Sequence, residues 1–196
     1  IAVANVLQKT NRLLSEDEKI TVLNNSIGCS IGMANVQKKI ITLDVFQTSH
    51  LLKSANKESI FNFITLIKAV NYHELAHLSF TDYSPKQIRE KIEDEYEKFT
   101  NVNSASSMEV SLKKWKLKFK QRLYISSPEF KQYLNILEDL RIEQLFSTQY
   151  PRAKFYFTFS LAILNNPQNL SQSKLNSETM LSLYALWYGR RQLFDV

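Results

Sequence analysis

Two histidines four residues apart flank a glutamate in the segment His73-Glu74-Leu75-Ala76-His77. In an α-helix this spacing places both imidazoles on one face, one turn apart, so that they can bind a common metal ion. Zinc accepts neutral imidazole nitrogens, and at a catalytic site it keeps one position for water. We therefore predict a Zn²⁺ site with His73 and His77 as ligands and Glu74 as general base. The alternative is that these are ordinary polar residues on a helix surface.

A third ligand is expected from a later helical segment, LNILEDLRIEQLF. Glu138 shares its helix face with Leu134, Ile142 and Leu145, which predicts a carboxylate on an apolar, buried surface. A buried carboxylate requires a cation, and we therefore predict Glu138 as the third metal ligand. The alternative is an ion pair between Glu138 and Arg141, one turn away.

Other carboxylates are candidates for supporting roles. Asp139 shares a more polar strip with Asn135 and Glu143, which is either solvated or able to orient a ligating histidine, and we interpret Asp139 in the second way. Asp82, five residues after His77, is a possible ligand, a support for one, or the cap of a turn, and a turn cap is the commonest of these. A side chain that stabilises a tetrahedral intermediate is usually Tyr, His or Arg; the candidates are Tyr83, Tyr150 and Arg141.

The composition favours one globular domain, residues 1–196, of an α+β class that is predominantly helical. The chain has 196 residues, 44% hydrophobic and 22% charged, with only three Gly and four Pro. Its single cysteine, Cys29, forms no internal disulfide, which favours a reducing, cytoplasmic compartment. No signal peptide or membrane span is expected. Because the first residue is Ile, the chain could be a fragment of a longer protein.

Periodicity and punctuation divide the chain into a mixed first part and a helical remainder. Strands are expected at 19–26 and 35–45, separated by Gly28 and Gly32, and the later of these could bind a substrate as an added strand. A polar loop or flap is expected at 100–110. The helices are expected at about 3–15, 57–80, 84–99, 113–123, 128–150, 151–165 and 177–194. The alternative at 113–123 is a strand through Trp115, Leu117 and Phe119.

The two segments HELAHLSFTDYS and NILEDLRIE together resemble a family of bacterial and phage zinc metallopeptidase domains. Members often precede a von Willebrand factor A-type domain, and the cobaltochelatase T subunit is a relative. The resemblance covers roughly residues 60–146 and implies a zincin-like fold. It also implies that His73, His77 and Glu138 bind the metal, that Glu74 is the base, and that Asp139, Arg141 and Glu143 are polar supports. Some relatives act with AAA+ ATPases, which implies a possible protein partner.

Several functions therefore compete. The leading hypothesis is zinc-dependent peptide hydrolysis of a peptide or protein substrate in a bacterial or phage-infected cell. An alternative is a scaffold domain with a closed structural zinc site of four protein ligands, working with an AAA+ ATPase or A-type partner. A repressor-cleaving regulator of the ImmA/IrrE type is disfavoured by the second motif. Nucleic-acid binding by the Lys-rich run 113–122 is the least favoured, although the net charge is +6.

Overall fold

The structure is a computed structural model that describes residues 2–28, 30–52, 56–81, 128–164 and 177–194. It is a mixed α+β structure, predominantly helical, as the composition predicts. The chain forms two compact units, residues 1–81 with 137–196 and residues 82–136. The helices expected at 84–99 and 113–123, the loop at 100–110 and the Lys-rich run lie outside the described residues. No helix in the described ranges has the length and apolarity to cross a membrane.

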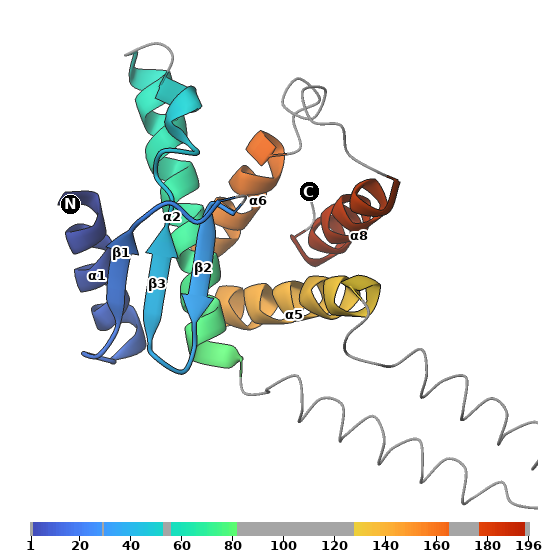
Figure 1. The fold of residues 1–196 in the computed structure, drawn as a ribbon, viewed down its shortest axis with the longest axis horizontal. Coiled ribbons are helices and arrows are strands. Elements are labelled where there is room, and N and C mark those ends of the chain that lie inside the picture. The colour runs from blue at the N-terminus through green and yellow to red at the C-terminus, as the bar shows by residue number, and fades with distance from the viewer. Residues whose placement is uncertain (1, 29, 53–55, 82–127, 165–176, 195–196) are drawn as a thin grey trace, which may run out of the picture. The chain divides into compact units, whose positions relative to one another are not determined.

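A three-stranded sheet lies at the N-terminal end of the first unit (Figure 1). Its strands are β1 (Thr21–Asn24), β2 (Gly32–Asn35) and β3 (Ile40–Leu43), in the order β1-β3-β2. β3 is parallel to β1 and antiparallel to β2. Helix α1 (Ala2–Ser15) packs beside β1, whereas helix α2 (Lys57–Phe80) packs against β2 and β3.

The second predicted strand, 35–45, is wrong in its bounds and in its proposed role. Residues 36–39 form a turn in which Lys39 has a positive φ of 56°, and only the β-branched segment after it forms β3. Because β3 is hydrogen-bonded to a strand on each side, it has no edge on which a substrate could add. The edge strand beside α2 is β2. The predicted strand 19–26 contains β1.

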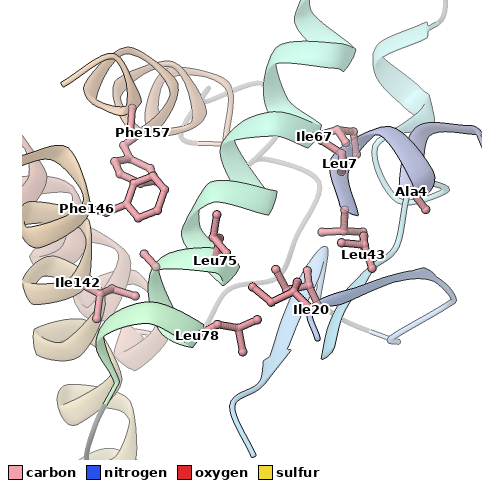
Figure 2. Packing of buried hydrophobic residues seen from close by; sticks show 14 of the residues in the cluster. Ala4, Leu7, Ile20, Leu43, Ile67, Leu75, Leu78, Ile142, Phe146 and Phe157 are labelled. Carbon is pink, nitrogen blue, oxygen red and sulfur yellow. The ribbon is translucent and has the colours of Figure 1, made fainter. Parts of the chain in front are cut away.

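Helix α2 has the bounds that its periodicity predicts, Lys57–Phe80. The side chain of Asn56 caps it by accepting a hydrogen bond from the Ser59 N–H at 2.8 Å, and the helix ends where Thr81 becomes extended. It is not a surface helix with one apolar stripe, because Ile60 and Ile64 are exposed while Glu74 is buried. Near its middle and C-terminal half the helix contributes to a core that continues on more than one side of it (Figure 2).

Three further α-helices are described, α5 (Pro128–Gln149), α6 (Ala153–Leu164) and α8 (Ser177–Phe194), and a short 3-10 helix, η1 (Ser49–Leu52), contacts α2. The positions of α5, α6 and α8 agree with the proline signals at 128 and 151 and with the last predicted helix. Ile142 and Phe146 of α5 and Phe157 of α6 join the core beside α2 (Figure 2), and the rings of Phe146 and Phe157 lie 6.1 Å apart. This arrangement places one face of α5 against the histidines of α2.

A buried polar pair joins α1 to α2. The side-chain amides of Asn11 and Asn71 are completely buried and donate to each other's oxygens at 2.9 and 2.7 Å. Each amide therefore recovers a hydrogen bond in place of its lost hydration, and the reciprocal pattern fixes the position of one helix along the other.

Candidate metal centre

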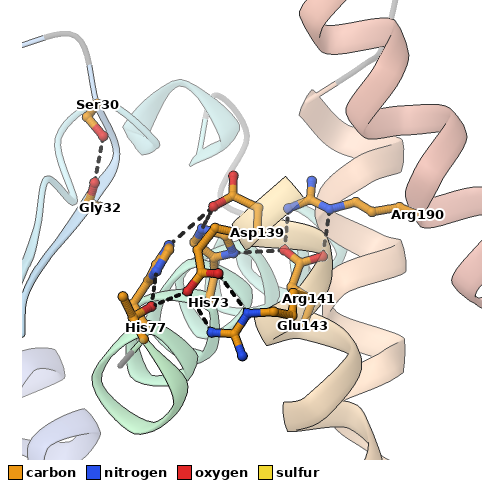
Figure 3. A network of polar contacts seen from close by, with 10 residues as sticks. Ser30, Gly32, His73, His77, Asp139, Arg141, Glu143 and Arg190 are labelled. Atoms are coloured by element: carbon orange, nitrogen blue, oxygen red, sulfur yellow. Dashed lines mark hydrogen bonds and ion pairs between the residues drawn. The ribbon is translucent and has the colours of Figure 1, made fainter. Parts of the chain in front are cut away.

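His73 and His77 meet a carboxylate from α5 on the inner face of α2. Asp139 Oδ1 lies 3.2 Å from His77 Nε2 and 3.6 Å from His73 Nε2, and the three ligand atoms all lie within 4.8 Å of one another (Figure 3). Ligand atoms about 2 Å from a tetrahedral zinc ion lie about 3.3 Å apart. The three side chains are each about one-fifth exposed. This group can therefore hold a metal ion that solvent can still reach.

The structure places Glu138 differently from the prediction that it is the third ligand. Glu138 Oε1 accepts hydrogen bonds from Thr81 Oγ1 at 2.7 Å and from Arg141 Nη2 at 2.8 Å. Its Oε2 accepts a third from Arg141 Nε at 2.7 Å. The alternative expectation, an ion pair between Glu138 and Arg141, is thus what the structure shows. The carboxylate that lies at ligand distance from both histidines is the next residue, Asp139.

The cause of this difference is the order of the faces of α5. Of the apolar residues predicted beside Glu138, Ile142 is completely buried but Leu145 is 40% exposed, whereas Glu143 on the polar strip is completely buried. The face of α5 toward α2 therefore includes Asp139 and Glu143 as well as Ile142. Carboxylates that face a cation site can be buried, so apolar neighbours alone do not identify the inward face.

The other ring nitrogen of His73 is held by Glu143. His73 Nδ1 lies 2.8 Å from Glu143 Oε1. Burial alone would raise the pKa of Glu143, but the charge of Arg190 and the hydrogen bond from His73 lower it, so this carboxylate is ionised and can only accept. His73 Nδ1 therefore carries the proton, and Nε2 is the nitrogen that faces Asp139.

His77 has a comparable support through a hydroxyl. The Thr81 hydroxyl donates to Glu138, so its oxygen must accept from His77 Nδ1–H at 3.1 Å. Burial would raise the pKa of Glu138, but the hydrogen bonds from Arg141 and Thr81 lower it. Glu138 is therefore linked to His77 by two successive hydrogen bonds, the first from His77 to Thr81 and the second from Thr81 to Glu138. Both histidines thus direct Nε2 toward Asp139, the arrangement found where supports fix a ligand's tautomer.

In the metal-free protein the proton affinity of His73 is high. Burial lowers its pKa, but the hydrogen bond and charge of Glu143, with Asp139 and Glu74, outweigh burial and raise the pKa of His73 to about 9. His73 is therefore an imidazolium at neutral pH when no metal is bound. A metal ion would replace the proton on Nε2, as metal binding to histidine requires.

Glu74 lies between the histidines and the edge strand. It is 7% exposed, and its carboxylate accepts a hydrogen bond from the backbone N–H of Ala34 in β2. A β-carbon placed on Gly32 would lie 2.7 Å from Glu74 Oε1, so glycine allows this close approach. Burial raises the pKa of Glu74, and the nearby charges of His73 and His77 lower it by less.

Among the described residues, the predicted site residues Arg141 and Tyr150 are not part of the group. Arg141 binds Glu138 and donates to the backbone carbonyl of Phe80 at 2.6 Å. The hydroxyl of Tyr150 donates to the backbone carbonyl of Leu14, and Tyr150 directly follows the C-terminal end of α5, eleven residues after Asp139. Asp82 and Tyr83 lie outside the described residues.

Sequence reasoning missed Arg190. This arginine of α8 donates to both oxygens of Glu143, from Nε at 2.7 Å and also from Nη2 (Figure 3). It lies 47 residues from its partner, and its neighbours Gly189 and Arg191 form no motif that connects it to the histidines. The one available signal is indirect: a buried Glu143 would need a cation from another element.

Comparisons of the chain with family models, with curated proteins and with solved structures find no significant match. The resemblance to the metallopeptidase family, and the partners that it implies, therefore stay predictions. Any proposal about the function of the chain depends on the chemistry of the site itself.

Proposed function

We propose that the chain is a zinc-dependent peptide hydrolase in which His73, His77 and Asp139 bind the metal. The observation that carries the proposal is an HExxH helix whose two histidines meet one carboxylate, with Glu74 buried beside them. Two imidazoles and one carboxylate form a typical ligand set of catalytic zinc. Bound zinc would supply Lewis acidity toward a peptide carbonyl and lower the pKa of water.

The residues of the chain have separate tasks in this reaction. Glu74, whose pKa is raised by burial, takes a proton from water at its carboxylate and then delivers it to the leaving amine. The Ala34 N–H of β2 lies beside that carboxylate and favours its ionised form. Glu143 and Thr81 hold the protons on Nδ1 of the two histidines, so that each Nε2 stays directed at the ligand group.

The number of ligands favours catalysis over the scaffold alternative. A structural zinc site has four protein ligands, whereas the group found among the described residues has three. A three-ligand site leaves a position for water or substrate. The scaffold alternative would require a fourth ligand from outside the described ranges.

The test replaces the general base and leaves the metal ligands intact. Zinc-loaded Glu74→Gln should retain wild-type zinc content and lose about 10²- to 10⁴-fold in the rate of hydrolysis of labelled, unfolded casein. Glu58→Gln is a matched control, because Glu58 is an exposed residue in the first turn of the same helix. Equal hydrolysis rates in the wild type and in Glu74→Gln, at equal zinc content, would reject this mechanism.

A further inference from the structure

The Glu143 carboxylate is enclosed on every side. It is 0% exposed, and both of its oxygens accept hydrogen bonds: Oε1 from His73 and Arg190, and Oε2 from Arg190. A carboxylate in such a position is tolerated only when a cation and hydrogen bonds replace its hydration. Arg190 supplies that cation, and it is itself only 8% exposed.

The geometry of this ion pair determines more than its charge. The guanidinium donates through Nε and Nη2 to the two oxygens of one carboxylate, which is the paired arrangement that fixes the carboxylate plane. The oxygen that accepts from Nη2 is also the oxygen that accepts from His73 Nδ1–H. Rotation of the carboxylate would therefore move the acceptor that orients the His73 ring.

The position of Arg190 depends on a close approach between α8 and α5. A β-carbon on Gly189 would lie 2.4 Å from Leu140 Cδ1, so any larger residue there would displace the Leu140 side chain from its present position against α8. Leu140 is one residue after Asp139 and three before Glu143. The contact thus holds the C-terminal helix at the level of the metal centre.

We propose that Arg190 is a positioning residue for the metal centre: it fixes the Glu143 carboxylate and, through it, directs His73 Nε2 at the metal. The inference rests on the proposed function, since it assigns His73 as a ligand. It extends the site to a third helix, α8, which contributes none of the three ligand atoms in the candidate group. Metal affinity therefore depends on the position of α8 against α5.

The experiment compares zinc affinity between variants of the full chain, by competition with a chromophoric chelator at fixed pH. Arg190→Met should raise the Kd for zinc by about 10- to 100-fold, the usual effect of removing a ligand's support. Arg190→Lys keeps the positive charge without the paired geometry and should have an intermediate Kd. Arg191→Met is the matched control, because Arg191 is exposed and stacks on Trp187 instead; its Kd should equal that of the wild type.

A second comparison separates positioning from a general structural effect. Glu143→Gln and Arg190→Met should not be additive in the Kd for zinc, since both act through the same hydrogen bond to His73. If Arg190→Met does not fold, Arg190→Lys with Glu143→Gln provides the same test.

Three results would overturn the inference. A folded Arg190→Met or Arg190→Lys protein with wild-type zinc affinity would reject the role of Arg190 alone, and so would additive effects in the double variant. A wild-type protein that binds no zinc would reject the metal centre itself, and this outcome is distinct from the other two.

Discussion

At the scale of single residues, the candidate site contains two imidazoles whose Nδ1–H groups both donate hydrogen bonds. Glu143 accepts one directly, and Glu138 accepts the other through the Thr81 hydroxyl. The Nδ1–H of each histidine is therefore hydrogen-bonded to a carboxylate, directly or through Thr81, while a third carboxylate, Asp139, faces Nε2 of both. The roles of Glu138, Asp139 and Glu143 depend on which imidazole nitrogen each one meets, directly or through Thr81.

The first prediction concerns pH. Because the pKa of His73 in the metal-free protein is about 9, metal binding below that pH must displace one proton from Nε2. Apparent zinc affinity should therefore rise about tenfold per pH unit between about pH 6.5 and 8.5. The same pKa shift affects the stability of the metal-free protein. The raised pKa of His73 stabilises the fold below pH 6.5, and this stabilisation is lost as the pH rises through 9. Calorimetric titration in buffers of different ionisation enthalpy measures the released proton; no release at pH 7 would contradict the assignment.

The second prediction concerns Thr81. Thr81→Val keeps the shape of the side chain but removes the hydroxyl between His77 and Glu138, so zinc affinity should fall by about tenfold. Thr148→Val is the control, because the Thr148 hydroxyl only donates to the carbonyl of Gln144 on an exposed face of α5. If both variants bound zinc as the wild type does, the hydroxyl relay would have no role.

Sequence predicts the two histidines of the candidate group better than it predicts the group's carboxylate. Because the two histidines are four residues apart on a helix, they lie on one face of it, and this follows from the spacing alone. The choice between Glu138 and Asp139 depends on the rotation of α5 about its axis, which tertiary packing decides. Ile142 is buried as its pattern predicts, but the exposure of Leu145 and the contacts of Asp139 and Glu143 with α2 show that the inward face is shifted toward the polar strip.

At the scale of elements, the site depends on how closely the edge strand β2 approaches α2. A β-carbon on Gly32 would lie 2.5 Å from Val70 Cγ1 as well as against Glu74, so there is no space for any larger residue. The sequence does not predict this contact, because a glycine between two β-branched runs indicates only a break between strands. Its actual role is to let a helix lie against the edge of the sheet.

The third prediction concerns this contact. Gly32→Ala should lower the free energy of unfolding by about 1–3 kcal/mol and should reduce hydrolysis, because β2 or Glu74 must move. Met33→Ala, at the adjacent and half-exposed position of the same strand, should change neither. Urea denaturation and the casein assay provide the two measurements. Wild-type activity and stability in Gly32→Ala would show that the contact is not needed.

At the scale of the whole described structure, α2 is the central element against which the others pack. The sheet and α1 contact it, and so do residues of α5 and α6. The bounds of α2 and the mixed, mostly helical class could be predicted from local patterns. The parallel pairing of β1 with β3 and the Asn11–Asn71 pair could not, because both join residues that are far apart in the chain.

The fourth prediction tests how α1 is joined to α2. Asn71→Leu should leave the Asn11 amide buried without its partner and lower the free energy of unfolding by about 1–3 kcal/mol. Replacing both asparagines by Leu should recover part of this loss, since no unpaired amide would remain. Chemical denaturation of the two single variants and the double variant measures the coupling. Independent, additive losses would contradict the account.

The most direct measurement of the central claim is the zinc content of three purified proteins: wild type, Asp139→Ala and Glu138→Ala. Asp139 is assigned as a ligand, whereas the adjacent Glu138 is assigned to orient His77 through the Thr81 hydroxyl. The wild type should therefore bind one equivalent of zinc at micromolar protein concentration, and Glu138→Ala should retain most of it. Asp139→Ala should lose it. Zinc retained by Asp139→Ala but lost by Glu138→Ala would contradict the ligand set.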